Sequence, residues 1–186
     1  MNFNKTIILR IKSKRTWSIL MSVFVYSSFF TQTIFDISRK GTEKEMISYL
    51  SNHPEHVNLL SERGSSPVLL AAYYGNNDVA RILIDKGAKL NECYAEGSLI
   101  CALIYKNNLD LLETILKKGA TIDDTCQFEQ FGYPLHFAMT LQRYEVIELL
   151  LKYNPSLKVV DPKGRTINEL LIQYKNPKLD EIFNKN

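Results

Sequence analysis

The chain has 186 residues, of which 45% are hydrophobic and 23% are charged, enough for one domain of ordinary size with a substantial apolar core. Five of its 23 basic residues precede Thr16, and the 18 that remain are outnumbered by 20 acidic residues. The chain after these five residues therefore carries no concentration of positive charge of the kind with which proteins bind phosphate backbones. The composition therefore argues against nucleic-acid binding.

The N-terminal segment combines a basic stretch with an uncharged run over residues 16–35. The strongly apolar part, residues 17–30, includes four serines and is shorter than the ~20 apolar residues that span a bilayer. We expect residues 1–30 to be a signal peptide, or an uncleaved signal anchor. The first places the protein in the periplasm or outside the cell, and the second anchors it to the membrane with its body outside the cytoplasm. A buried or mis-started N-terminus is the remaining alternative.

The remainder, residues 31–186, repeats itself at a period of about 33 residues. Asp78 recurs as Asp110, and Gly87 recurs as Gly119, each 32 residues later. A period of this length is typical of stacked supersecondary units rather than of a single globular core.

The clearest unit has the residue types of two short helices. The Ser66 hydroxyl can cap a helix, and Pro67 is tolerated at the first helical position because no amide donor is needed there. The apolar residues that follow predict a first helix, which ends at Gly75, and Asp78 opens a second helix. Gly87 closes the second helix, because glycine adopts the left-handed conformation without steric cost. A lone pair of such helices cannot bury its apolar face, so neighbouring units must stack on it.

These residues resemble the ankyrin repeat, whose pattern reads G-x-T-P-L-H-x-A-A-x-x-G, then V-x-x-L-L, then G-A. The best match begins at Gly64, passes through Ser66-Pro67 and ends at Gly87-Ala88. Weaker copies cover residues 98–120 and 133–155, a terminal unit covers 164–183, and a degenerate first unit covers about 33–50. The resemblance implies an all-α solenoid of about five helix-turn-helix units with hairpin loops between them. We expect an ankyrin-repeat domain over residues 31–186, with the atypical end units as caps.

The polar residues suggest little catalytic chemistry. No G-x-x-x-x-G-K-[ST], H-E-x-x-H or G-x-S-x-G motif occurs in the sequence, and we expect a protein that is not an enzyme and has no cofactor. His136 occupies the histidine position of the T-P-L-H box, so the resemblance implies that it bonds neighbouring backbone. His53, Glu55 and His56 could offer metal ligands, but Pro54 argues against one helix that presents them all. We expect an exposed loop there and no metal site.

Three cysteines occur, of which Cys93 and Cys126 fall at nearly equivalent places in consecutive loops. Stacked units lie about 10 Å apart, whereas a disulfide needs Cα atoms within about 7 Å. We therefore expect unpaired thiols, with a bridge in an oxidising compartment as the alternative. Cys101 is expected to pack in the core as a small apolar residue.

Tyrosines point to a partner-binding surface. In the family's pattern, the two positions before the inter-helix glycine project towards the concave face. Tyrosine fills four of the ten such positions, and tyrosine is enriched at protein interfaces. Aromatic residues also occur in two loops, so we predict a contact surface made of Tyr73, Tyr74, Tyr94, Tyr105, Lys106, Phe128 and Tyr174. The alternative is that the rings pack against neighbouring helices.

The resemblance implies a non-catalytic protein–protein interaction module. Together with the N-terminal segment, it suggests a monomeric bacterial protein, exported to the cell envelope, that binds a protein partner of unknown identity. An immunity protein against a toxin and an accessory to an envelope enzyme are two such roles. The alternatives are a redox or metal accessory protein that uses Cys93 and Cys126 or His53 and His56, and a secreted effector that binds a host protein. Contact with a membrane is expected only through an uncleaved N-terminal segment.

Overall fold

The computed structural model describes residues 34–94, 97–123, 126 and 132–185. These residues lie within one compact unit, Ile34–Asn186. The expected signal peptide, residues 1–30, and the predicted contact residue Phe128 lie outside the described residues.

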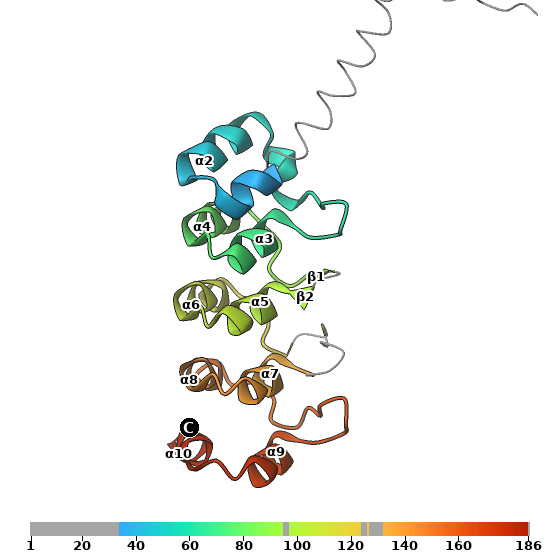
Figure 1. Cartoon of the computed structure of the whole chain (residues 1–186), viewed down its shortest axis with the longest axis vertical. Coiled ribbons are helices and arrows are strands. Elements are labelled where there is room, and N and C mark those ends of the chain that lie inside the picture. Colours follow the sequence, from blue (N-terminus) through green and yellow to red (C-terminus); the bar gives the residue numbers. More distant parts are fainter. Residues whose placement is uncertain (1–33, 95–96, 124–125, 127–131, 186) are drawn as a thin grey trace, which may run out of the picture. The chain divides into compact units, whose positions relative to one another are not determined.

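The described residues form five helix pairs that stack one on the next (Figure 1). The pairs are helical residues 34–40 with α2 (Glu43–Asn52), α3 (Pro67–Tyr74) with α4 (Asn77–Asp85), α5 (Leu99–Lys106) with α6 (Leu109–Lys117), α7 (Pro134–Thr140) with α8 (Tyr144–Leu151), and α9 (Ile167–Tyr174) with α10 (Pro177–Lys185). A 3-10 helix, η1 (Pro54–Asn58), follows α2. Strands β1 (Cys93–Tyr94) and β2 (Gly97–Ser98) pair antiparallel, with Cys93 opposite Ser98. The expected repeat of helix pairs is confirmed.

Local residue chemistry sets the helix boundaries. The Ser66 side chain accepts a hydrogen bond from the Leu69 amide at 3.3 Å and so caps α3, with Pro67 at its first position. Gly75 ends α3 with a φ of +75°, a left-handed conformation that glycine adopts without strain. Asn107 takes the equivalent position after α5 with a φ of +55°. Asparagine tolerates this conformation better than most other residues do, which explains how the third unit keeps its turn without glycine.

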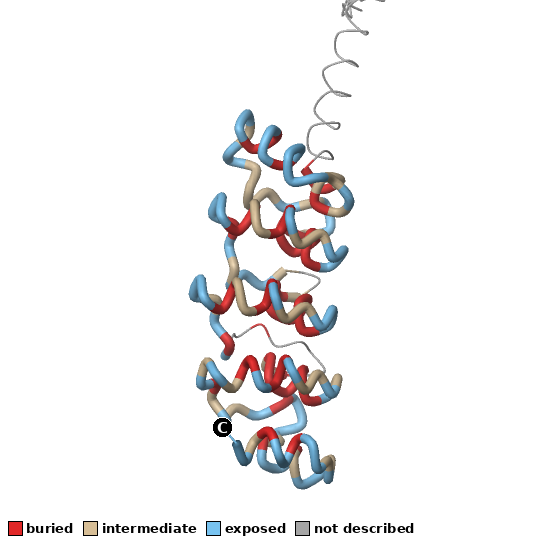
Figure 2. Tube along the Cα trace, turned by 90° about the vertical axis from the view of Figure 1, so that its left-hand side faces the viewer, coloured by how far each residue is buried: buried red, intermediate tan, exposed pale blue. Residues whose placement is uncertain are grey.

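The core runs through every layer of the stack, between the helices of each pair and between neighbouring pairs (Figure 2). The small Ala71 and Ala72 of α3 are fully buried and allow close approach of the neighbouring helices. Leu83 of α4 and Leu150 of α8 are also fully buried. Burial of this kind is available only when units stack, since each pair contributes its apolar residues to a shared interior.

Hydrogen bonds also join the loops of consecutive units. In each case a side-chain oxygen of one unit accepts a hydrogen bond from a backbone amide about one repeat later in the chain. The three pairs are Asn58 with Lys89 at 2.9 Å, Asn91 with Thr121 at 3.0 Å, and Asp123 with Ser156 at 2.9 Å. These bonds fix the spacing of adjacent units on the loop side of the stack.

Candidate functional site

Four of the predicted contact residues lie together at the ends of α3 and α5. Tyr73 and Tyr74 form the last turn of α3, and Tyr105 and Lys106 form the last turn of α5. The three tyrosines are 46%, 57% and 50% exposed, respectively, although the residues that precede them in each helix are buried. Positions one repeat apart meet in neighbouring layers, which is why these residues form one group.

The rings contact one another and basic side chains. Tyr73 and Tyr105 stack with their ring centroids 6.3 Å apart and their planes 3° from parallel, and Tyr74 meets Tyr73 edge-on at 5.7 Å. The Lys106 ammonium lies 4.8 Å from the centre of the Tyr73 ring, and the Arg39 guanidinium lies 5.8 Å from that of Tyr74. Both distances are within the range of cation–π attraction. We call these five residues the aromatic–basic surface.

Arg39 was not among the predicted contact residues. It follows from the same pattern, because Arg39 occupies, in the first unit, the position that Tyr73 occupies in the second. Its side chain reaches from one unit to the next, and it also pairs with Asp36 at 3.5 Å. The repeat position therefore indicates which residues lie at this surface, even in the unit where the residue is not a tyrosine.

Tyr174 and Tyr94 are placed differently from these five. Tyr174 ends α9, is half-buried, packs against the core, and has its hydroxyl 3.3 Å from the Thr140 hydroxyl of the preceding unit. The ring of Tyr174 therefore packs between neighbouring units, as the alternative interpretation expected, rather than lying exposed as a contact residue. Tyr94 is half-buried in β1, where it lies opposite Gly97.

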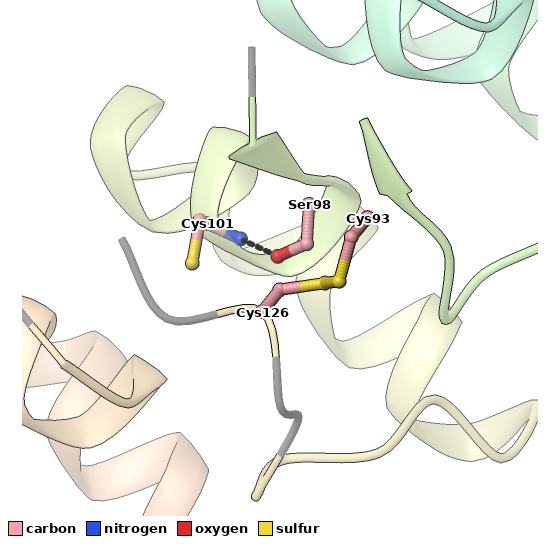
Figure 3. The surroundings of a disulfide bond; sticks show 4 residues. All are labelled: Cys93, Ser98, Cys101 and Cys126. Carbon is pink, nitrogen blue, oxygen red and sulfur yellow. Dashed lines mark hydrogen bonds between the residues drawn. A yellow bond between two sulfur atoms is a disulfide. The ribbon is translucent and has the colours of Figure 1, made fainter. Parts of the chain in front are cut away.

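Cys93 and Cys126 form a disulfide between consecutive loops, with their Cα atoms 5.5 Å apart (Figure 3). The expectation of unpaired thiols was wrong, because it took the spacing between stacked units as the spacing between their loops. Cys93 lies in β1, and Cys126, which follows α6 in the chain, lies beside that strand. Cys101 of α5 is 1% exposed, as expected for a residue that packs in the core.

His53, Glu55 and His56 lie together at the end of α2. Their candidate ligand atoms all lie within 4.8 Å of one another. The segment is exposed at Pro54 and Glu55, as expected, but it is the 3-10 helix η1 rather than a loop, and both histidines are partly buried. The Tyr49 hydroxyl lies 2.8 Å from Nδ1 of His56. The structure thus brings together three residues that the sequence analysis did not expect to form a metal site.

His136 is 1% exposed and lies in the interior of α7. Burial lowers the pKa of its imidazole, and the Asp161 carboxylate and the Arg165 backbone partly oppose this shift. Neither ring nitrogen makes a hydrogen bond of standard geometry to a described residue, so the Arg165 backbone acts on the imidazole at less than ideal geometry. A neutral, buried imidazole of this kind fits a packing role.

Within the described ranges, no helix has both the length and the apolar character that a membrane span requires.

Several curated proteins resemble this chain. Tyrosine-protein kinase HTK16 of Hydra vulgaris is 28% identical over 131 residues, which cover 69% of this chain and 17% of the kinase. The human transient receptor potential cation channel subfamily V member 6 is 23% identical over 61% of this chain and 17% of the channel. The rat ankyrin repeat and SAM domain-containing protein 6 is 25% identical over 48% of this chain and 10% of that protein. The chain thus spans less than a fifth of each relative.

Two family models match the chain. Residues 34–126, half of its length, match a model described as ankyrin repeats in three copies, and residues 99–156 match one described as ankyrin repeats in many copies. Ankyrin repeats are protein–protein interaction modules and are typically non-catalytic, although a kinase is among the relatives. The matched residues include all of α3 to α6 and the turns that carry the aromatic–basic surface. On this evidence the chain belongs to the ankyrin-repeat family.

Proposed function

We propose that this ankyrin-repeat domain is a non-catalytic module that binds a protein partner through its aromatic–basic surface. The observation that carries the proposal is the exposure of Tyr73, Tyr74 and Tyr105 by about half, although each follows a buried stretch of helix. The stacked helices bury their apolar residues without these rings. Exposed aromatic groups that gather in one place are typical of surfaces that a partner covers.

The chemistry of the surface indicates an acidic partner. Lys106 and Arg39 lie over the tyrosine rings, and Lys40 is exposed beside Arg39. A partner segment that carries carboxylates next to apolar side chains would pair with the cations and cover the rings. Such electrostatic pairing speeds association and weakens at high salt. We therefore expect the association rate constant to fall as the ionic strength rises.

Comparative affinity capture tests the proposal. The full chain, a variant with Tyr73→Ala, Tyr74→Ala and Tyr105→Ala, and an Ile172→Ala control are used as baits in parallel. Ile172 is 73% exposed on α9, away from the aromatic–basic surface in sequence and unit, so its loss removes apolar area elsewhere. We expect a protein that the wild type and the control retain and the triple variant loses. Equal retention by all three baits would contradict the proposed surface.

We further propose that the repeat domain is exported, so that its partner is an envelope or extracellular protein. The uncharged run over residues 16–35 after a basic stretch supports export. The Cys93–Cys126 disulfide supports it independently, because disulfides persist mainly in oxidising compartments. An immunity protein or an accessory to an envelope enzyme would fit this location.

Fractionation of bacterial cells that express the full chain tests export. We expect the protein in the periplasm or medium, with a new N-terminus near residue 31 after cleavage of the signal peptide, or in the membrane fraction if the segment remains as an anchor. Protein found in the cytoplasm with Met1 intact would overturn the proposal.

A further inference from the structure

We propose that His53, Glu55 and His56 form a zinc-binding site at the junction of α2 and η1. The inference rests on the geometry of these residues and is independent of the proposed partner surface. His and carboxylate side chains in a set of three are ligands that Zn²⁺ accepts, with water at the open fourth position.

The local fold brings the three side chains together. Helix α2 ends with the His53 amide donating a hydrogen bond to the Tyr49 carbonyl at 3.0 Å, and Pro54 then begins η1. The His56 amide donates to the His53 carbonyl at 3.1 Å, which closes a tight turn. The two imidazole rings stack beside this turn, with centroids 5.1 Å apart and planes 12° from each other. Glu55, between them in sequence, reaches both.

The distances are close to those of a metal site. Glu55 Oε1 lies 3.4 Å from His56 Nε2 and 3.9 Å from His53 Nδ1. A tetrahedral zinc ion with bonds of about 2.1 Å separates its ligand atoms by about 3.4 Å. The present separations, all within 4.8 Å, therefore need inward side-chain movements of about 1 Å to hold the ion.

The exposure of the side chains permits such movement. The Glu55 side chain is 65% exposed, and those of His53 and His56 are 31% and 22% exposed, respectively. Glu55 can therefore rotate freely, and solvent can supply both the entry path and the fourth ligand. The turn keeps both imidazoles beside Glu55, and one of the two stacked rings rotates about its side-chain bonds so that both nitrogens face the same ion.

Tyr49 positions one of the imidazoles. Its hydroxyl lies 2.8 Å from His56 Nδ1, and the residue is 9% exposed in α2. When Nδ1–H donates to this oxygen, the proton is on Nδ1, and the Nε2 lone pair faces Glu55. A second partner that fixes the tautomer of a ligating histidine in this way is a regular part of zinc sites.

The expected consequence is stabilisation of the first repeat unit. The ligands lie at the end of α2 and in the turn that leads to the second unit, so a bound ion would join the two segments. Because the ion would bind the folded turn and not the unfolded chain, its presence raises the free energy of unfolding in proportion to the logarithm of its concentration over Kd.

Titration of the full chain with Zn²⁺, after treatment with a chelator, tests the site. We expect one ion per chain by calorimetry, with a rise in the thermal midpoint, and a visible absorption spectrum when Co²⁺ replaces Zn²⁺. Glu55→Gln and His56→Gln should each weaken Zn²⁺ binding at least tenfold. Glu62→Gln, at an exposed glutamate outside the cluster, is the matched control and should bind as the wild type does.

Tyr49→Phe separates positioning from packing. It keeps the ring in the core but removes the hydroxyl, so we expect about tenfold weaker Zn²⁺ binding and an altered Co²⁺ spectrum with little change in the thermal midpoint of the metal-free protein. Glu55 is exposed, so its variant also tests the site without endangering the fold. Absence of Zn²⁺ binding by the wild type, or equal binding by Glu55→Gln and His56→Gln, would overturn the proposal.

Discussion

Asp161 is a buried carboxylate that organises the turn before α9. One of its oxygens accepts hydrogen bonds from the Lys163 and Arg165 amides, each at 2.9 Å, and the other accepts from Arg165 Nε at 2.8 Å. Burial raises the pKa of Asp161, but the hydrogen bonds from Arg165 and Lys163 outweigh it, so the pKa lies below its usual value of 3.8. The folded protein therefore favours the ionised carboxylate.

This shift predicts a loss of stability in acid. A carboxyl whose pKa is lower in the folded protein contributes stability fully above about pH 4, and the contribution disappears as the pH falls through the folded-state pKa. Asp161→Asn should lower the free energy of unfolding at neutral pH by about 2 kcal/mol, and it should show a smaller further loss on acidification than the wild type. Thermal melts over a pH series measure both effects. The exposed Asp180→Asn is the control, and equal acid sensitivity of the wild type and Asp161→Asn would contradict this account.

The ends of helices could be predicted from the sequence. Ser66 and Pro67 mark the start of α3, and Gly75 marks its end, because capping and left-handed turns depend on one or two neighbouring residues. The grouping of Tyr73 with Tyr105 was also predictable, since the repeat places equivalent positions in adjacent layers. Tyr174 has the same repeat position, at the end of α9 in the last helix pair, but its ring is half-buried and packs against the core.

The paired loops were harder to predict than the helices. The bridge between Cys93 and Cys126 depends on where the hairpin of β1 and β2 places Cys93 relative to the next unit, which the helix spacing does not determine. The cluster of His53 and His56 depends on a single 3-10 turn that begins at Pro54. In both cases the residue spacing was visible in the sequence, but the backbone path that brings the side chains together was not.

The disulfide should stabilise the junction of the two loops that it joins. Its cysteines are 33 residues apart, and closing a loop of this length in the unfolded chain is worth up to about 4 kcal/mol. We expect a reductant to lower the thermal midpoint of the wild type but not that of Cys93→Ser. Mass spectrometry after alkylation without reduction should label neither Cys93 nor Cys126.

A Cys101→Ala variant is the matched control for the disulfide, since Cys101 is a buried residue of α5 that takes no part in the bridge. This variant should remain sensitive to the reductant. Full alkylation of Cys93 and Cys126 in the native, unreduced protein would show that the bridge does not form.

At the scale of the whole repeat domain, stability depends on contacts between neighbouring units. Leu83 and Leu150 are fully buried in two different units. Leu83→Ala or Leu150→Ala should each lower the free energy of unfolding by about 2 to 5 kcal/mol, because each leaves a cavity in the shared core. Chemical denaturation measures the loss. The surface variant Tyr73→Ala should unfold near the wild-type midpoint, and equal midpoints for all three variants would show that the inward face is assigned wrongly.

The central claim, that half-exposed tyrosines at the ends of α3 and α5 contact a protein partner, is tested most directly on Tyr74→Ala. The measurement pairs the dissociation constant for the captured partner with the thermal midpoint of the variant. Tyr74 is 57% exposed, so its truncation should leave the midpoint close to that of the wild type. The account predicts a loss in affinity of about 2 kcal/mol, or about 30-fold. Unchanged affinity together with a lowered midpoint would contradict it, because the ring would then serve the packing of the fold rather than the contact with a partner.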